Sequence, residues 1–431
     1  MNAEGRLLQH RAFVQFWIAR VSTTVAMQIM GVAVGWQIYE LTNSALDLGL
    51  VGLFQFLPAL LLLLVAGHFA DRYDRRKIIA SAQVMQAAAV ALLALGAARG
   101  WMTRELILAT VFMIGAGRAF EAPTMSALLP RLVPLPLLSR AVAVSSAAHQ
   151  AAVIAGPALG GLLYYYAGPV FAYAAASTLY AAASVLILLV RSAPVETKRE
   201  PPDLRMFFAG ITFIRRNPVV LGAISLDLFA VLLGGVSALL PIFARDILAV
   251  GPDGLGLLRA SPGIGALLIS VFLARWRPRR RVGHVMFTAV AGFGVATIVF
   301  GVSRSFPLSC LALAVLGAMD MVSVVIRQTL IQLYTPDSMR GRVNAVNTLF
   351  VGTSNQLGDF RAGVTAALFG AEPSALIGGI GTLLVVVIAL RVFSALLEVA
   401  NLDAPPAVKT PLAPTDPTEL QPGASSDRGK A

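Results

Sequence analysis

Twelve long apolar stretches dominate this chain and leave it few ways to fold. They cover residues 13–39, 47–68, 78–98, 104–121, 140–163, 169–190, 219–244, 254–274, 284–303, 307–326, 344–369 and 374–397. A bilayer core about 30 Å thick is crossed by ~20 apolar residues in a helix, and a helix satisfies its own backbone polar groups where lipid offers none. A membrane β-barrel would need alternating segments of about ten residues, which the sequence lacks. The sequence therefore predicts an all-α polytopic membrane protein of about twelve transmembrane helices.

Composition supports this class and excludes several kinds of chemistry. The 431 residues are 57% hydrophobic and 13% charged, whereas soluble domains carry about 25% charged residues. The single Cys310 cannot form a disulfide within the chain. The only Gly-Lys pair is Gly429–Lys430, so a G-x-x-x-x-G-K-[ST] phosphate loop is absent. Because HExxH and clustered Cys are absent as well, we expect no cofactor, no metal and no enzymatic activity.

The distribution of basic residues predicts the orientation. Of the 34 Lys and Arg, 26 fall in the N-terminus, in alternate loops and in the C-terminal part from Arg391, and we place this set in the cytoplasm. Five fall in the other loops: Arg99, Arg104, Arg245, Arg259 and Arg304. Both termini of a multi-pass protein of the cell inner membrane are then cytoplasmic. Anionic inner-leaflet lipid accounts for the net charge of +12, so no nucleic-acid partner is expected. The polar N-terminus leads directly into a full-length span, so no cleavable signal peptide is expected.

Composition also divides the chain. Residues 192–217 carry charge and a Pro pair, and we predict a cytoplasmic linker there between two six-helix bundles, 1–191 and 218–402. Within the linker, "LRMFFAGITFI" could lie as an amphipathic helix on the membrane surface. Residues 403–431 are rich in Pro and small polar residues, so a disordered cytoplasmic tail is predicted.

The two halves repeat one another. Residues 133–144 and 335–346 align at a shift of 202, and the same shift pairs Gly156 with Gly358 and Gly161 with Gly363. Several matches at one offset indicate a duplicated unit, as in transporters built from parallel repeats. The two bundles are therefore expected to be pseudo-symmetric.

A charged loop carries a family resemblance. Residues 67–79 read GHFADRYDRRKII, which resembles the G-x-x-x-D-R-x-G-R-R signature of the major facilitator superfamily. The matching residues are Gly67, Asp71, Arg72, Arg75 and Arg76. Asp74 replaces the second Gly, and Asp tolerates turns well. The resemblance covers residues 10–400 and implies two bundles that expose a central pathway to each side in turn.

Longer segments resemble one branch of that superfamily. "TPDSMRGRVNAV", "LGDFRAG", "GVAVGWQIYELTNSALDLGLVG" and "ADRYDRRKII" resemble the enterobactin-exporter-like, transmembrane secretion effector branch. "GPALGG" at 156–161 resembles the core of the superfamily's antiporter motif, although Ala148 and Ala152 stand where the fuller motif has Gly. This resemblance implies export and proton antiport.

The resemblance implies that the charged loop is a latch. Gly67, Asp71, Arg72, Asp74, Arg75 and Arg76 would hold the form that is closed towards the cytoplasm. An Asp at a helix end can also pair with Arg or with a helix N-terminus, and such a bond is worth roughly 1–3 kcal/mol. Alternatively, the basic residues only fix topology and the aspartates offset their repulsion.

Gly156, Pro157, Gly160 and Gly161 predict a special contact in the fifth span. Pro157 removes one helical hydrogen bond, and the glycines allow a neighbouring helix to approach closely. A hinge, a tight interhelical seal and plain small-residue packing all remain open.

Ionisable residues inside the spans are functional candidates because burial in lipid disfavours charge. They are Arg20, Arg118, Glu121, Asp227, Asp320, Asp359 and Arg361. Arg118 and Glu121 lie three residues apart and could neutralise each other, or Glu121 could lie at the membrane edge. Asp227 is the leading proton-carrier candidate, and structural ion pairing is the alternative for all seven. Gln28, Gln37, Gln55 and Trp36 could line a cavity, although Trp36 could equally be an interfacial anchor. His149 is a possible relay or a locally satisfied His.

The sequence therefore predicts a secondary active transporter of a small molecule, a proton-coupled exporter that works by alternating access. Its expected partners are the solute, protons and membrane lipid, and a monomer is the default expectation. An importer or facilitator, and a membrane sensor or interaction protein that has lost transport, are the alternatives. An intramembrane enzyme is disfavoured because no convergent nucleophile or metal set is present.

Overall fold

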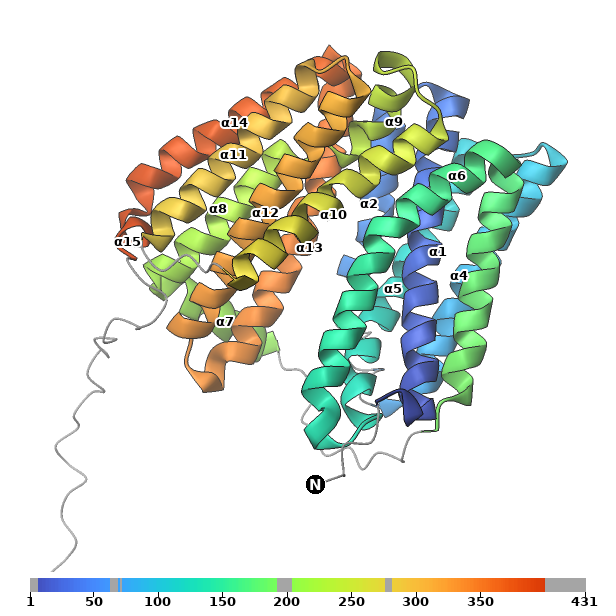
Figure 1. Ribbon diagram of the computed structural model, residues 1–431, viewed down its shortest axis with the longest axis horizontal. Coiled ribbons are helices and arrows are strands. Elements are labelled where there is room, and N and C mark those ends of the chain that lie inside the picture. Colours follow the sequence, from blue (N-terminus) through green and yellow to red (C-terminus); the bar gives the residue numbers. More distant parts are fainter. Residues whose placement is uncertain (1–6, 63–68, 70–71, 192–203, 276–280, 400–431) are drawn as a thin grey trace, which may run out of the picture.

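The computed structural model describes residues 7–62, 69, 72–191, 204–275 and 281–399. Among these residues every regular element is a helix (Figure 1). The first half contains η1 (Leu7–Gln9), α1 (Arg11–Thr42), α2 (Ala45–Leu61), α4 (Arg75–Arg99), α5 (Arg104–Leu128), η2 (Leu129–Arg131) and α6 (Leu135–Leu189). The second half contains α7 (Leu204–Arg216), α8 (Pro218–Gly234), η3 (Ser237–Leu239), α9 (Leu240–Ile242), η4 (Phe243–Ile247), α10 (Pro252–Arg275), α11 (Val282–Val302), α12 (Phe306–Tyr334), α13 (Asp337–Phe369), α14 (Ala371–Val392) and α15 (Ser394–Leu397).

Twelve helical crossings follow from these elements. Nine helices of the described chain are long and apolar enough to span a membrane. One of them, α6, bends at Gly168, whose φ of 78° is followed by Pro169, so this helix supplies two crossings. Helices α2 and α13 complete the set, the latter with 33 residues. The predicted fold class, an all-α membrane protein with twelve transmembrane helices in two bundles, is confirmed.

Short polar residues begin several of these helices. Ser44 accepts the Asp47 N–H at the start of α2, Thr103 accepts the Leu106 N–H at the start of α5, and Asn217 accepts the Val220 N–H at the start of α8. Each side chain satisfies a backbone donor that has no partner within its own helix. These caps fix where the connecting segments end and the crossings begin.

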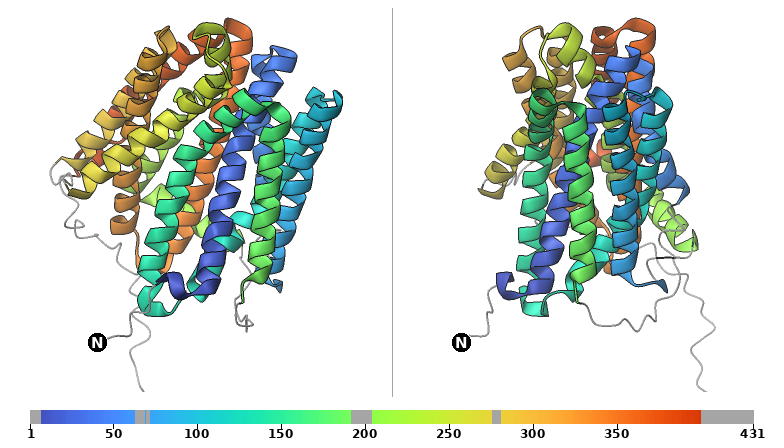
Figure 2. Two further views of the ribbon diagram at one scale, coloured as in Figure 1. Left: turned by 45° about the vertical axis from the view of Figure 1, so that its right-hand side comes forward. Right: turned by 90° about the vertical axis from the view of Figure 1, so that its right-hand side faces the viewer.

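The two bundles lie side by side, meet at one end and separate towards the end that holds the N-terminus (Figures 1 and 2). We call the first the closed end, which holds Asn43, Gly251 and Gly370, and the second the basic end, which holds Asp74, Arg281 and Pro336. The bundles touch mainly through two helix pairs, α2 with α13 and α6 with α10.

Glycines allow this close approach. A Cβ added to Gly363 of α13 would lie 2.6 Å from the Gly49 Cα of α2. A Cβ on Gly161 of α6 would overlap the Pro252 carbonyl oxygen and lie 3.1 Å from the Gly256 Cα of α10. Because Gly161 and Gly363 are equivalent in the sequence repeat, the duplicated position serves the same purpose in both halves: a backbone contact with the other bundle.

Several boundaries differ from the sequence prediction. The span predicted at 307–326 continues as α12 to Tyr334, so Arg327 is a buried helical residue and not a loop residue. Arg259, which we grouped with the outer loops, lies within α10. Part of the predicted linker forms α7, where Ile214 is buried and Gly210 packs against the Arg342 carbonyl of α13. The rest of the linker, 192–203, and the predicted tail, 403–431, lie outside the described residues.

Candidate substrate site between the bundles

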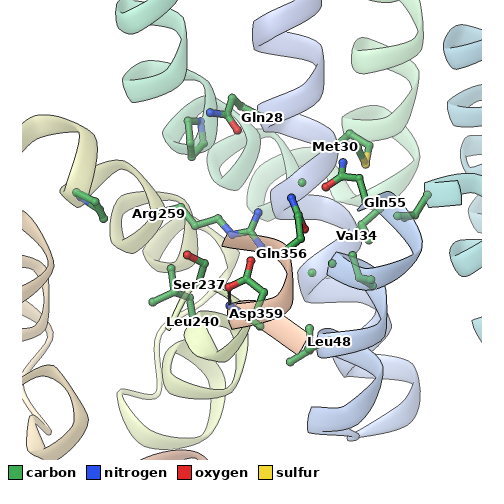
Figure 3. Close-up of a pocket in the computed structure, with 18 of the residues that line it drawn as sticks. Gln28, Met30, Val34, Leu48, Gln55, Ser237, Leu240, Arg259, Gln356 and Asp359 are labelled. Carbon is green, nitrogen blue, oxygen red and sulfur yellow. Dashed lines mark hydrogen bonds between the residues drawn. The ribbon is translucent and has the colours of Figure 1, made fainter. Parts of the chain in front are cut away.

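A cavity of about 260 Å³ lies between the two bundles (Figure 3). Both halves of the chain line it, through α1, α2, α5 and α6 on one side and η3, α9, α10 and α13 on the other. Its lining residues are Gln28, Met30, Gly31, Val34, Gly35, Leu48, Val51, Gly52, Gln55, Val111, Val153, Pro157, Ser237, Ala238, Leu240, Arg259, Pro262, Gly263, Gln356 and Asp359. An apolar wall with a few convergent polar groups is typical of a small-molecule site.

The first bundle contributes mostly apolar side chains and two amides, those of Gln28 and Gln55. The Gln28 Nε2 donates to the Val153 carbonyl at 3.3 Å, which orients its amide along the boundary between α1 and α6. Trp36 and Gln37 do not line the cavity: Trp36 packs against the apolar core, and Gln37 accepts a hydrogen bond from the Tyr173 hydroxyl at 2.6 Å. Of the four residues that we expected to line a cavity, only the two glutamines Gln28 and Gln55 do so.

Arg259 of α10 is the cation of the cavity. Its guanidinium reaches across the bundle boundary to two glycines of α1: a Cβ on Gly31 would lie 2.9 Å from Nη1, and a Cβ on Gly35 would lie 3.0 Å from Nη2. The Arg259 Nε is buried and makes no hydrogen bond in the described part of the chain. This guanidinium therefore retains donors for a ligand in the cavity.

Asp359 of α13 is the carboxylate of the same cavity, and Figure 3 shows it directed towards Arg259. Its Oδ1 accepts the Ala238 N–H of η3 at 3.2 Å. Arg259 and Arg361 are the two cations that act on its charge. The Arg361 Nη2 donates to the Gly235 carbonyl at 3.2 Å, and its Nε and Nη1 have no partner among the described residues. Burial disfavours the charge of this carboxylate and the two cations favour it, so Asp359 can exchange a proton, or compete with an anionic ligand for the arginines.

Polar contacts join the bundles above the cavity, at the closed end. The Tyr39 hydroxyl of α1 donates to Asp246 of η4. The Arg245 Nη1 donates to the Asn43 Oδ1 at 2.9 Å, and its guanidinium lies 5.5 Å from the centre of the Tyr39 ring. Together with the glycine contacts, these groups hold the two bundles together on one side of the cavity.

The "GPALGG" segment lies where three helices meet. Gly156 packs on Gln28 and Gly160 packs on Ile29, both of α1, while Gly161 packs on α10. Pro157 lines the cavity, and its carbonyl lies against Gly256 of α10. Helix α6 runs without interruption through Pro157 as far as Gly168. The structure thus contains the close packing that was predicted, and the hinge stays a prediction.

Asp227 does not line the cavity. It pairs with Arg327 of α12 inside the second bundle, and their side chains are only 4% and 3% exposed. The structural ion pair that we weighed as an alternative fits this residue. Asp320, also on α12, is half-buried and makes no hydrogen bond or ion pair to any residue that the structure describes.

Glu121 is buried, with 5% of its surface exposed. It accepts hydrogen bonds from the Gln83 Nε2 at 2.8 Å and the Gln86 Nε2 at 3.1 Å, both on α4, rather than forming an ion pair with Arg118. Arg20 donates to the Ser145 hydroxyl of α6 at 3.1 Å, and His149 bonds the Thr24 hydroxyl at 3.0 Å.

Two members of the predicted latch, Gly67 and Asp71, lie outside the described residues. Asp74 caps α4 by accepting the Arg76 N–H at 3.0 Å, and its other oxygen accepts the Arg76 Nη2 at 2.7 Å. This hydrogen bond from the guanidinium lowers the pKa of the Asp74 carboxyl. Arg76 also donates to the Val190 carbonyl at 2.8 Å, Arg75 donates to the Ala127 carbonyl at 3.0 Å, and Arg72 is exposed. These bonds of Asp74, Arg75 and Arg76 lie within the first bundle, and the latch stays a prediction.

Sequence reasoning missed two residues of consequence. Arg259 falls inside the predicted span 254–274, and a charge inside a span was the available signal for it. Arg327 falls one residue beyond the span 307–326. A small error in where that span ends removed the partner of Asp227 from consideration.

Known proteins resemble this chain over almost its whole length. The family model described as "Transmembrane secretion effector" matches residues 6–420. The chain is 28% identical over 402 residues to the enterobactin exporter EntS of Escherichia coli O81 (strain ED1a), covering 91% of this chain and 95% of that protein. It is 29% identical, with the same coverage, to the enterobactin exporter EntS of Escherichia coli O9:H4 (strain HS).

Solved structures share the fold at low sequence identity. The nucleoside transporter NupG superposes with a TM-score of 0.68 at 12% identity, over 89% of this chain and 99% of that one. A bacterial homologue of the iron transporter ferroportin superposes with a TM-score of 0.68 at 16% identity, over 91% of this chain and 100% of that one.

Proposed function

Because this chain belongs to the transmembrane secretion effector family and is a membrane transporter of the major facilitator type, we propose that it exports a small molecule in exchange for protons. It would work by alternating access, with each end of the molecule opening in turn. Export is supported by the enterobactin exporters, which match nearly the whole chain.

One observation carries this proposal: a cavity that both bundles line and that contacts between the bundles shut on the side of the closed end. Gly161 against α10 and Gly49 against Gly363 close one side by backbone contact. Small residues make such contacts reversible, because no long side chain must leave a pocket when the helices separate. A solute bound at Arg259 and Asp359 would change sides when these contacts open and the basic end closes.

Asp359 is the proposed proton carrier. As a carboxylate it accepts the Ala238 N–H and stabilises Arg259 and Arg361. When it is protonated, its attraction for Arg259 is lost, and the guanidinium is released towards the cavity. Proton binding and solute binding are then coupled through one side chain. Asp320, the half-buried carboxyl of α12, is the second candidate.

The orientation and the division of the chain are part of the same proposal. The basic end would face the cytoplasm at the inner membrane, since most of the Lys and Arg that the structure describes lie there. Residues 1–191 and 218–402 would move as two bundles joined by 192–217, and 403–431 would be a cytoplasmic tail. The loop around Asp74 and Arg76 would latch the basic end when it closes.

Proteoliposomes with an imposed pH gradient test this function. The probes are enterobactin, which the relatives are named for, and three dansyl compounds: dansylglycine (anionic), dansylamide (neutral) and dansylcadaverine (cationic). The gradient should drive accumulation of at least one of them by the wild type, and Asp359→Asn should remove this dependence. Glu105→Gln, an exposed acid at the closed end, is the control and should transport as the wild type does. Gradient-independent behaviour of all four probes with wild-type protein would overturn the proposal.

A further inference from the structure

Three polar contacts between α1 and α6 follow one another along one side of the first bundle. Arg20 donates to the Ser145 hydroxyl, Thr24 bonds His149, and Gln28 donates to the Val153 carbonyl. Each pair is separated by 125 residues, so α1 and α6 run parallel with a constant offset. The contact of Gln28 with Val153 lies at the cavity, and the other two contacts lie successively nearer the basic end.

Arg118 of α5 lies at a similar depth. It follows the cavity residue Val111 by seven residues, which is two helical turns, so both project from the same face about 10 Å apart. By the same rise, Arg20 lies about 12 Å from Gln28 and His149 about 6 Å from Val153, in the same direction. Three side chains that can carry positive charge thus lie between the cavity and the basic end, and we call them the cationic cluster.

Neither arginine of the cationic cluster forms an ion pair with a carboxylate that the structure describes. Arg20 and Arg118 both act electrostatically on His149. Arg118 makes no hydrogen bond or ion pair to a residue in the described ranges, and Arg20 donates to a hydroxyl group. The carboxylate of Glu121, three residues further along α5, offsets part of the charge of Arg118 and accepts hydrogen bonds from Gln83 and Gln86. All three members are half-buried.

An excess of positive charge inside the membrane-spanning helices is costly and marks a candidate functional site. We propose that the cationic cluster is an approach site for an organic anion, which binds there through a carboxylate or similar oxyanion before it reaches Arg259 in the cavity. The proposal rests on the proposed function and adds a substrate class to it. Guanidinium groups suit this ligand because they donate paired hydrogen bonds to planar oxyanions.

An anionic lipid headgroup presents the same chemistry as a soluble anion. The position of the cluster favours the solute. Arg118 shares a helix face with Val111 of the cavity, and the contact of Thr24 with His149 lies about one helical turn from Gln28. A lipid headgroup site would instead be expected at the rim of the basic end, at the level of the bilayer surface.

Equilibrium binding to protein in nanodiscs of phosphatidylcholine tests the proposal. The fluorescence of dansylglycine and dansylamide, which differ by a carboxylate, is titrated against wild type, Arg118→Gln, Arg118→Lys and the double variant Arg20→Gln with Arg118→Gln. Wild type should prefer the anion by about tenfold, the change expected of one charge-assisted hydrogen bond. The preference should fall in Arg118→Gln, persist in Arg118→Lys and fall further in the double variant, in which Arg259 is the remaining cation of the path.

Arg99→Gln removes an exposed Arg at the far end of α4 and should keep the wild-type preference. Equal affinity of wild type for the two probes, or an unchanged preference in the double variant, would overturn the proposal. A second set of nanodiscs contains phosphatidylglycerol. If the double variant loses bound phosphatidylglycerol by mass spectrometry but keeps the wild-type preference for dansylglycine, the ligand is a lipid headgroup and the proposal is wrong.

These outcomes are separable from those of the proposed function. Gradient-driven transport of dansylamide or dansylcadaverine, with equal binding of the anionic and neutral probes, would keep the exporter and remove the anion site. Anion-selective binding without gradient-driven transport would keep the anion site and remove the proposed exporter function.

Discussion

Among the residues that the structure describes, the polar side-chain contacts between the two bundles lie at the closed end, whereas the ion pairs at the basic end lie within one bundle. At the closed end, α1 bonds η4 through Tyr39 and Asp246, and glycines bring α6 against α10 and α2 against α13. These contacts join one bundle to the other. In the basic half, Asp74 bonds Arg76 within the first bundle, and Asp227 bonds Arg327 within the second. From this difference we expect that contacts between the bundles decide which end is open, whereas contacts inside each bundle decide whether it stays folded.

If this division holds, substitutions in the two regions should have different consequences. Removing a contact inside a bundle should lower the free energy of unfolding and leave the relative position of the bundles unchanged. Removing a contact between the bundles should change their relative position and leave the free energy of unfolding nearly unchanged. Four substitutions test this, in order of decreasing expected effect.

Arg327→Leu should have the largest effect, because it leaves Asp227 buried without its partner. Breaking a buried pair by removing one member costs roughly 3–5 kcal/mol, so the free energy of unfolding in detergent should fall by about this amount. The double variant Asp227→Leu with Arg327→Leu removes both charges and should recover most of it. If the single variant unfolds like wild type, the pair is not a stabilising element of the second bundle.

Gly161→Val should open the closed end, because its side chain would overlap the Pro252 carbonyl of α10. Overpacking of this kind costs about 1–3 kcal/mol, and here separation of the bundles relieves it. The measurement is the rate at which a short bis-methanethiosulfonate reagent joins cysteines at positions 43 and 245, with Cys310 replaced by Ser. The rate should fall about tenfold.

Gly352→Val is the matched control, because a Cβ on Gly352 of α13 meets no atom within 4 Å. Its cross-linking rate should equal that of the parent protein. Equal rates for Gly161→Val and Gly352→Val would show that the α6–α10 contact does not hold the closed end.

Tyr39→Phe should have a smaller effect of the same kind, since it removes only the hydroxyl that donates to Asp246. A hydrogen bond to a charged group is worth roughly 1.5–3 kcal/mol when sheltered, and partial solvent access reduces this. We expect the same cross-linking rate to fall about threefold. Tyr166→Phe, at a Tyr that is 80% exposed, should leave it unchanged, and a similar fall in both variants would exclude a specific role for Tyr39.

Asp74→Ala should have the smallest effect, because it removes an exposed helix cap within one bundle. Such caps contribute about 1 kcal/mol. The Arg76 guanidinium lowers the pKa of Asp74 in the folded protein, so its contribution is present above the ordinary Asp value and is lost as pH falls through the folded value. Unfolding of the two proteins should therefore differ at neutral pH and converge in strong acid, and a difference that grows in acid would contradict this assignment.

Much of the fold could be predicted because membrane crossing imposes a length and a polarity on each helix. The apolar stretches located the crossings, and the repeat placed Gly161 and Gly363 in equivalent positions. Helix ends were less predictable: Arg327 lies inside α12 because the helix continues past its apolar part. A few residues at such a boundary decide whether an arginine is a loop residue or half of a buried pair.

The candidate site was only partly predictable, because a cavity depends on how helices that are distant in sequence face one another. Asp359 could be found as a charge within a span, but its distinction from Asp227 required the partners of both. Glu121 and Arg118 share a helix face, yet the two glutamines of α4 hold Glu121. Local spacing shows which groups can pair, and tertiary packing decides which of them do.

Distances between spin labels test the central claim most directly. In a Cys310→Ser background, one labelled pair, Ser139→Cys with Ser338→Cys, reports on the basic end, and another, Glu105→Cys with Ser305→Cys, reports on the closed end; all four sites are exposed. Pulsed electron–electron double resonance in nanodiscs measures the distance between the labels of each pair, with and without Gly161→Val. The account predicts that the substitution lengthens the closed-end distance and shortens the basic-end distance. Distances that stay unchanged, or that change in the same direction at both ends, would contradict it.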